Sequence, residues 1–328
     1  MALQSGCSSA VFVVVAFLTA VSPFPSQAQT ASRIEVHPIR TMTQTDEQFL
    51  TGSKDGEPTV LAGELRIPRP GTDRLPAVLL VHGAGGIGGN IDRWAQVLNA
   101  IGVAAFVLDG FTGRGIASVS QDPTQLGRTP MIADSYRALE ILAKHPRIDP
   151  TRIAVMGFSR GGQAALYSSL KRFQKMHGPQ GLEFAAYVIF YAPCNLRFID
   201  DDQVADKPIR LFHGTADDFV YVAPCRAYVE RLRAAGKDVQ LTEYPGAQHV
   251  FDGPHIKAPI FQPQGITTRH CVTEEKPIGR IINSQTQQTF SYDDPCVERG
   301  ATIAYDAEAY SQVLVAVKGF LTEVFQLK

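Results

Sequence analysis

The stretch RIAVMGFSRGG at residues 152–162 decides the fold. It begins with a short apolar run typical of a buried strand, continues through the pattern G-x-S-x-G, and leads into an amphipathic segment. A sharp turn between a strand and a helix holds its central serine, Ser159, in a strained conformation, and only the flanking glycines leave room for it. The stretch therefore predicts a serine hydroxyl presented at the end of a buried strand.

Similar apolar runs recur along the chain and alternate with stretches in which apolar residues repeat with the period of a helix. This alternation predicts an α/β fold, a mostly parallel central sheet with right-handed crossovers and helices on both faces. Val60, Leu61 and Leu65, ahead of Pro68, predict an antiparallel edge hairpin that leads into the sheet. The predicted strands are 77–81, 103–108, 153–156, 185–191, 209–212 and 239–244, and the predicted helical faces span 94–101, 132–143, 165–173, 225–232 and 314–324.

The first residues have the pattern of a signal peptide. Residues 1–28 contain no Asp, Glu, Lys or Arg, and the apolar run from Ala10 to Val21 is too short to span a bilayer. Ser26 and Ala28 are small residues where signal peptidase reads them. We expect cleavage after Ala28 and a periplasmic or secreted protein, with a retained anchor or a buried helix as the alternative. The mature chain then has an N-terminal extension at 29–58 and a main domain at 59–328.

Charge and residue spacing exclude two classes of partner. The chain has 31 Lys and Arg against 32 Asp and Glu, a net charge of -1, so it lacks the excess of basic residues that nucleic-acid binding needs. No close pair of cysteines lies near a histidine cluster, so we expect no metal. No later apolar stretch is long enough for a membrane span, and the sequence does not indicate an oligomeric state.

Four cysteines remain after the predicted cleavage, and an even number in an exported chain indicates disulfides. Cys194 ends one predicted strand and Cys225 opens the helix after the next, so neighbouring parallel strands would bring them within reach of each other. Cys271 and Cys296 lie in a polar stretch at about 253–300 that breaks the strand-helix alternation. Of the three connectivities we predict Cys194 to Cys225 and Cys271 to Cys296, the second closing an excursion ahead of the last helix.

The first glycine-rich loop allows an alternative function. Residues 83–88 fit G-x-G-x-x-G after a strand and before a helix, and Asp109 ends the next strand where an acid would bind ribose. This pattern is typical of a nicotinamide-dinucleotide site. However, His82 separates the strand from the first glycine, and an exported protein meets little nicotinamide cofactor. A non-catalytic binding protein with the same fold is a second alternative.

Two later loops favour catalysis by Ser159. The segment HGTADD at 213–218 places Asp217 directly after a strand, and His249 lies in the loop after the following strand. Serine, aspartate and histidine in this order, each at the carboxyl end of a parallel strand, are typical of α/β-hydrolases.

The sequence resembles the dienelactone hydrolase family from about Leu65 to Leu327, through HGAG at 82–85, GFSRGG at 157–162, HGTADD at 213–218 and QHVFD at 248–252. The resemblance implies an α/β-hydrolase fold, no cofactor, and a catalytic triad of Ser159, Asp217 and His249. The enzymes that give the family its name use cysteine as nucleophile, whereas this chain has Ser159. We therefore expect hydrolysis of carboxylic esters or lactones through an acyl-enzyme, with amide hydrolysis as an open alternative.

Each expected role follows from physical chemistry. His249 would take the proton of Ser159, and Asp217 would fix the tautomer of the imidazole. Asp218 is the rival for this role, but the family's G-x-x-D spacing from Gly214 ends at Asp217. The backbone N–H groups of Arg160 and Ala84 are the expected oxyanion hole.

Five further residues are candidates for contact with a small ester substrate. Arg114 would bind a carboxylate through two parallel hydrogen bonds, although such an arginine is more often part of a structural ion pair. The aromatic candidates would form an apolar wall, with a place in the core as the alternative. They are Phe111, Phe158, Tyr191 and Phe219.

Overall fold

The structure, a computed structural model, describes residues 1–2 and 31–327. The predicted signal peptide and its cleavage site at Ala28 lie outside the described residues, apart from the first two positions. Within the described part of the chain, no helix combines the length and the apolar character needed to cross a bilayer.

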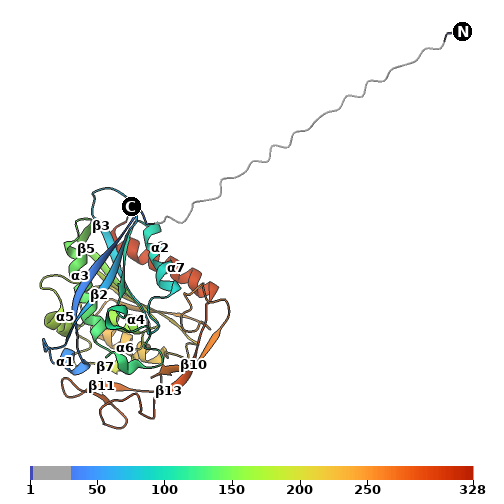
Figure 1. Cartoon of the computed structure of the whole chain (residues 1–328). Coiled ribbons are helices and arrows are strands. Elements are labelled where there is room, and N and C mark those ends of the chain that lie inside the picture. The colour runs from blue at the N-terminus through green and yellow to red at the C-terminus, as the bar shows by residue number, and fades with distance from the viewer. Residues whose placement is uncertain (3–30, 328) are drawn as a thin grey trace.

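A central sheet of eight strands organises the molecule (Figure 1). Its strands are β1 (Arg33–Thr43), β2 (Glu57–Ile67), β3 (Leu75–Val81), β4 (Ala104–Asp109), β5 (Ile148–Phe158), β6 (Ala186–Phe190), β8 (Ile209–Gly214) and β9 (Val239–Tyr244). They lie in the order β1-β2-β4-β3-β5-β6-β8-β9, and the six from β4 to β9 in this order are parallel. The predicted α/β class is confirmed, as are the six parallel strands and the antiparallel edge hairpin.

Helices cover both faces because successive residues of each buried strand point to opposite sides. Leu79 packs into one core, with α3 (Pro130–Lys144), α4 (Arg160–Tyr167), α5 (Lys171–His177) and α6 (Ala223–Ala234). Its neighbour Leu80 packs into the other core, with α2 (Gly89–Ala100) and α7 (Ala307–Phe325), which lie together in Figure 1. Three short elements complete the helices: α1 (Asp46–Leu50) and the 3-10 turns Thr112–Arg114 and Pro123–Gln125.

The helix predicted over 165–173 is two helices, α4 and α5. Ser168 and Ser169 direct their hydroxyls back to the carbonyl oxygens of Ala165 and Leu166, a bond that competes with the helical ladder. Leu170 then forms an antiparallel bridge with Val204. A single helical period could not reveal this interruption, because both helices bury the same apolar face.

The edge hairpin begins earlier than the sequence indicated. All of β1 pairs with β2, from Arg33 opposite Ile67 to Thr43 opposite Glu57. This strand lies in the range 29–58 that the sequence analysis separated as an extension. Its apolar residues alternate with polar ones on an edge, so the run carries a weaker signal than a buried strand.

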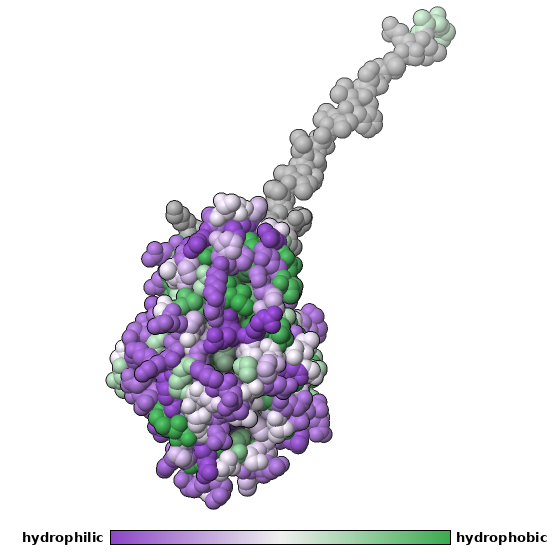
Figure 2. Space-filling view, turned by 60° about the vertical axis from the view of Figure 1, so that its left-hand side comes forward, coloured by the Kyte–Doolittle hydropathy of each residue, from purple (hydrophilic) through white to green (hydrophobic). Residues whose placement is uncertain are grey.

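The surface of the edge hairpin is mixed in character. The face in Figure 2 is mostly hydrophilic, with smaller hydrophobic areas between the polar ones. Ile34 and Val36 of β1 and Val60 of β2 are exposed. Along β1, Arg33 precedes Ile34, and Glu35 lies between Ile34 and Val36. Charged side chains along an edge strand discourage pairing with a further strand.

The excursion at about 253–300 contains short strands that its polar sequence did not predict. A two-stranded sheet joins β10 (Ile260–Thr267) to β13 (Glu298–Ile303). A second small sheet joins β11 (Thr273–Glu275), β12 (Ile281–Asn283) and β7 (Leu196–Arg197), so the excursion is paired to the segment that follows β6.

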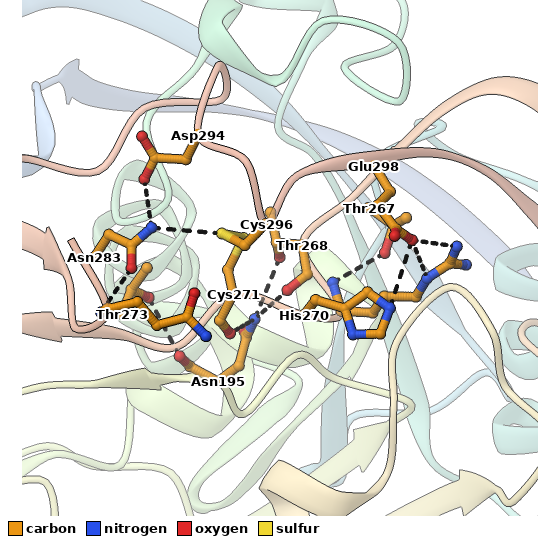
Figure 3. Close-up of a disulfide and its surroundings, with 12 residues drawn as sticks. Asn195, Thr267, Thr268, His270, Cys271, Thr273, Asn283, Asp294, Cys296 and Glu298 are labelled. Atoms are coloured by element: carbon orange, nitrogen blue, oxygen red, sulfur yellow. Dashed lines mark hydrogen bonds and ion pairs between the residues drawn. A yellow bond between two sulfur atoms is a disulfide. The ribbon is translucent and has the colours of Figure 1, made fainter.

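Both predicted disulfides are confirmed. Cys194 and Cys225 are bonded with their Cα atoms 4.9 Å apart, and the Cα atoms of Cys271 and Cys296 are 5.0 Å apart. Figure 3 shows the second bond and the side chain of Asn195, which donates to the carbonyl oxygens of Thr268 at 2.7 Å and Cys271 at 3.0 Å. These contacts fix the excursion beside the carboxyl ends of the central strands.

Candidate active site

Ser159 lies at the turn between β5 and α4, with φ of 53° and ψ of -115°. A positive φ is strained for a residue with a side chain, and it presents the hydroxyl at the edge of the sheet. The flanking glycines are required by space: a Cβ at Gly157 would lie 2.0 Å from the carbonyl oxygen of Gly161, and one at Gly161 would lie 2.1 Å from that of Val81. The local geometry is the one that the G-x-S-x-G pattern predicts.

The loops after β8 and β9 bring Asp217 and His249 to the same place. His249 Nε2 lies 3.0 Å from Ser159 Oγ, and His249 Nδ1 lies 2.7 Å from Asp217 Oδ2. A carboxylate can only accept, so Nδ1 carries the proton and Nε2 is free to accept from the serine hydroxyl. Three residues that span 90 positions of the sequence, from Ser159 to His249, thus form a continuous chain of hydrogen bonds.

The Asp217 carboxylate is buried and held in its charged form. Its Oδ1 accepts the backbone N–H groups of Phe219 at 2.9 Å and Val220 at 2.8 Å. Burial alone would raise the pKa of Asp217, but the charge of His249 and the hydrogen bonds from His213 and His249 outweigh it and hold the pKa well below its usual value.

Asp218, the rival acid, points elsewhere. Its Oδ1 accepts the backbone N–H of Thr302 at 2.8 Å, which ties the loop to β13. His213, for which the sequence motif predicted no role, is buried beside Asp217. Its Nε2 lies 2.8 Å from the carbonyl oxygen of Val220 and 3.4 Å from Asp217 Oδ2. Both neighbours accept, so Nε2 carries a proton that supports this turn.

The two expected oxyanion donors lie around the same cavity as Ser159. Ala84 and Arg160 both line it. Arg160 is the first residue of α4, where backbone N–H groups have no acceptor within the helix and the helix dipole favours negative charge. His82 fixes the loop that carries Ala84, since its Nδ1 lies 2.8 Å from the carbonyl oxygen of Gly83 and its Nε2 accepts from Gly110 N–H at 3.1 Å.

The cavity at Ser159 is small, about 90 Å³. Several of its lining residues were missed by the sequence analysis because no local motif marks them and because some come from the excursion. Those residues are Val119, Ser120, Pro123, Arg128, Gln163, Pro193, Asn195, Val220, Ile266, Thr267, Thr268 and Tyr292.

Of the four aromatic candidates, Phe219 lines the cavity, with its ring 5.1 Å from that of His249. Phe111 and Phe158 are core residues: the first packs against His82 at 4.4 Å and the second stacks on Phe190 at 4.9 Å. The structure thus assigns these two to the alternative that the sequence left open.

The structure places Arg114, a candidate for substrate contact, in the alternative role of a structural ion pair. Its guanidinium forms a buried ion pair with Asp134 at 2.8 Å and 3.0 Å, and it also donates to Thr43 Oγ1 and the carbonyl oxygen of Gly110. These bonds use four of the five N–H donors of the guanidinium and hold the loop after β4 against α3 and β1. The buried Asp134, which the sequence pattern did not single out, determines this placement.

Tyr191 packs against His249 and is itself held by a hydrogen bond to Asp252. Its ring lies 4.6 Å from that of His249, and its hydroxyl donates to Asp252 Oδ1 at 2.7 Å. Trp94 Nε1 donates to the other oxygen of Asp252 at 2.8 Å. Tyr191 and Asp252 are therefore buried positioning groups for the loop that carries His249.

The dinucleotide alternative receives no support from the loop geometry. Asp109, the acid expected to bind ribose, instead accepts the backbone N–H groups of Phe111 at 3.0 Å and Thr112 at 2.9 Å. The glycine-rich loop places Ala84 on the serine cavity.

Among the described residues, one cluster of side chains that could ligate a metal is formed by Glu35 and His37 of β1 and by His145, which follows α3. The backbone N–H of Arg147 donates to His145 Nδ1 at 3.2 Å, so His145 Nε2 carries the proton that it donates to Glu35 at 3.1 Å. A protonated Nε2 cannot ligate a metal, and we assign the cluster as a hydrogen-bonded one.

Two curated proteins are similar in sequence to part of this chain. The chain is 30% identical over 102 residues to the acyl-protein thioesterase 1 of Gibberella zeae, covering 31% of this chain and 43% of that protein. It is 30% identical over 188 residues to a provisionally named esterase, NocK, of Nocardia uniformis subsp. tsuyamanensis, covering 50% of this chain and 51% of that protein. The chain thus spans about half or less of these curated relatives.

A solved structure supports the fold. The crystal structure of a dienelactone hydrolase-like promiscuous phosphotriesterase from metagenomic libraries matches with a TM-score of 0.56 at 18% identity, over 89% of this chain and 98% of that one. This match confirms the α/β-hydrolase fold.

The model of the dienelactone hydrolase family matches residues 63–264, a region that includes Ser159, Asp217 and His249. The chain therefore belongs to the dienelactone hydrolase family.

Proposed function

We propose that this protein is a serine hydrolase that cleaves carboxylic esters through an acyl-enzyme at Ser159. The observation that carries the proposal is the hydrogen-bond chain from Ser159 Oγ through His249 to Asp217, at 3.0 Å and 2.7 Å. Family membership supports ester hydrolysis in general terms, and the esterase and thioesterase names of the relatives agree with it.

In the proposed reaction, His249 takes a proton from Ser159 and passes it to the leaving alcohol. Ser159 Oγ attacks the ester carbonyl carbon while its proton passes to His249 Nε2, and Asp217 stabilises the imidazolium that forms. The N–H groups of Ala84 and Arg160 stabilise the negative carbonyl oxygen. When the tetrahedral species collapses, the alcohol leaves with the proton of His249. A water molecule, deprotonated by His249, then releases the acid and restores Ser159.

Kinetics of three variants test the proposal on a chromogenic ester. Ser159→Ala and His249→Ala are each expected to reduce kcat by about 10⁶-fold, and the double variant to be little worse, because the residues act as one proton-transfer unit. Ser311→Ala and His270→Ala, at exposed residues that do not line the cavity, are the matched controls. A folded Ser159→Ala variant that keeps most of the activity would contradict the proposal.

We further propose that the enzyme works outside the cytoplasm, in the periplasm or as a secreted protein. The signal-like segment and the two disulfides support this location, since disulfides persist in oxidising compartments. N-terminal sequencing of protein from the native host tests the proposal: we expect the mature chain to begin at Gln29, whereas a chain that begins at Met1 or Ala2 would contradict export by cleavage.

A further inference from the structure

A larger cavity lies next to the one that contains Ser159. Its volume is about 470 Å³, and the two cavities share Ser120. It is lined by the loop at 118–121, by residues 261–265 of β10, and by Gly85, the neighbour of the expected oxyanion donor Ala84. We call this cavity the β10 groove. Its size falls within the range of about 300 to 1,000 Å³ that is typical of small-molecule sites.

A β-bulge shapes the wall that β10 contributes to the groove. β10 pairs with β13 (Figure 1), and residues 263–265 stand opposite Gly300 alone. Bulges beside active sites redirect side chains from the regular alternation of a strand. Gly300 has φ of 91°, and a Cβ there would lie 2.8 Å from Phe261 Cζ, so the missing side chain makes room for the Phe261 ring. This residue is 62% exposed, and it lines the groove.

The lining of the β10 groove is polar but uncharged. Among the described residues that form it, none carries a charge, and Phe261 is its one aromatic residue. A glutamine amide and a serine hydroxyl can each donate and accept a hydrogen bond. Within the described chain, no other residue hydrogen-bonds to the glutamine amides of the groove, so they are available to a ligand. The polar residues are Ser118, Ser120, Gln121, Gln262 and Gln264.

This combination of groups fits a sugar. The hydroxyls of a sugar donate and accept as the amides do, and the C–H groups on one face of a pyranose ring form an apolar surface that packs on an aromatic ring. A fatty chain would bury the glutamine and serine groups without partners, which is costly. A charged ligand would find no opposite charge in the lining.

The groove also lies where the alcohol of an ester would leave. The leaving oxygen takes its proton from His249 Nε2, so the alcohol must lie beside the loop that carries His249. That loop is joined to the wall of the groove, because His249 forms a bridge with Ile303 of β13, and Ile303 pairs with Ile260 of β10. The alcohol side of the reaction therefore faces the β10–β13 pair.

Backbone hydrogen bonds hold the groove against the expected oxyanion loop. The N–H of Val119 donates to the carbonyl oxygen of Ala84 at 2.8 Å, and the N–H of Ile266 donates to that of Ser120 at 2.9 Å. A wall fixed in this way binds a ligand without first being ordered. The cavity at Ser159, at about 90 Å³, has room for a short acyl group only. The two cavities together fit an ester with a small acyl part and a larger alcohol part.

We propose that the β10 groove binds the sugar of a carbohydrate ester whose short acyl group, acetyl in the simplest case, reacts with Ser159. This inference rests on the proposed ester hydrolysis at Ser159. Ser159 takes the acyl group, and the sugar leaves as an alcohol with the proton of His249 while its ring packs on Phe261. Water then releases the acid from Ser159.

The test compares two acetates of primary alcohols. They are methyl 6-O-acetyl-α-D-glucopyranoside and cyclohexylmethyl acetate, which carries a six-membered ring without hydroxyl groups, and release of acetate measures both. Hydrogen bonds from the groove to the sugar hydroxyls predict a ratio of kcat/KM, sugar ester over cyclohexylmethyl ester, of at least about 10. The variant with both Gln121→Leu and Gln264→Leu is expected to bring this ratio close to one. Gln312→Leu, at an exposed glutamine of α7, is the control and is expected to keep it.

Variants of Phe261 test the aromatic contact. Phe261→Ala is expected to lower kcat/KM for the sugar acetate about 10-fold, mainly through a higher KM, because the ring is part of the binding surface and not of the proton-transfer unit. Phe261→Tyr keeps an aromatic face and is expected to keep most of kcat/KM. Val315→Ala, at an exposed apolar residue of α7 that is 73% exposed, is the control.

The outcomes separate this inference from the proposed function. If the cyclohexylmethyl ester is cleaved with a kcat/KM equal to or above that of the sugar acetate, the sugar site is overturned and ester hydrolysis stands. An unchanged kcat/KM for the sugar acetate in Phe261→Ala would also overturn it, as would cleavage of 4-nitrophenyl acetate without cleavage of either alkyl acetate. If the unmodified enzyme cleaves none of the three acetates, both proposals fail.

Discussion

His177 provides a quantitative prediction about stability and pH. It is the last residue of α5 and is 6% exposed. Its Nε2 donates to the carbonyl oxygen of Phe49 at 2.8 Å, and its ring stacks on that of Phe49 at 4.0 Å. Burial lowers the pKa of His177 from 6.5 to about 4, and the nearby charges of Lys54, Arg137 and Arg172 add to this effect.

The sign follows from proton binding in the two states. Below about pH 6.5 the unfolded chain protonates this histidine, whereas the folded protein keeps it neutral down to about pH 4. The unfolded state thus binds more protons in this window, and the free energy of unfolding decreases as the pH falls through it. A shift of about 2.5 units corresponds to about 3 kcal/mol, fully present above pH 6.5 and lost near pH 4.

Denaturant unfolding of the unmodified protein and His177→Gln, at several pH values from 7 to 4, measures this contribution. At pH 7 the variant is expected to be less stable, because the stacking on Phe49 is lost. The stability difference is expected to shrink by about 3 kcal/mol as the pH approaches 4, since the carboxyl groups common to both proteins cancel. His270→Gln, at an exposed histidine, is the control. A stability difference that stays constant across this range would refute the reasoning.

Three other changes have expected outcomes. Asp217→Asn is expected to lower kcat by about 10⁴-fold, because the imidazole loses the acceptor that fixes its tautomer, and steady-state kinetics on a chromogenic ester measures the loss; a kcat close to that of the unmodified enzyme would contradict this role. Arg114→Met leaves the buried Asp134 uncompensated, and denaturant unfolding is expected to show a loss of about 3 to 5 kcal/mol without a change in KM, whereas a raised KM would restore a substrate role. Replacing Cys271 and Cys296 together by serine opens a loop of 25 residues and is expected to cost about 3 kcal/mol in the loop-entropy model, measured by thermal unfolding beside the unmodified protein; equal stability of the two would contradict it.

The parts of the fold that followed from the sequence are those with a local cause. The inner strands β3, β4 and β6 and the second half of β5 are nearly continuous apolar runs because both of their faces are buried. The turn at Ser159 is encoded by glycines that close backbone contacts require. The family match then confirmed the resemblance on which the site residues were predicted.

The remaining features depend on contacts between distant residues. The polar strand β10 forms because it pairs with β13, and the residue pattern within 260–267 does not predict that pairing. The pairing of Arg114 with Asp134 is likewise a tertiary contact, and it cannot be read from the loop after β4 alone. Arg128 and Tyr292, which are 164 positions apart, meet at the cavity only through the folded excursion.

Covalent labelling of Ser159 tests the central claim most directly. The purified protein is treated with a fluorophosphonate, and the modified residue is located by peptide mass spectrometry, with Ser159→Ala treated in parallel. The proposed mechanism predicts one phosphonyl group per chain, attached to Ser159, absent from Ser159→Ala, and formed far more slowly in His249→Ala because the base is missing. Labelling of a different residue at the same rate in Ser159→Ala, or no labelling of an unmodified protein that hydrolyses esters, would contradict the mechanism.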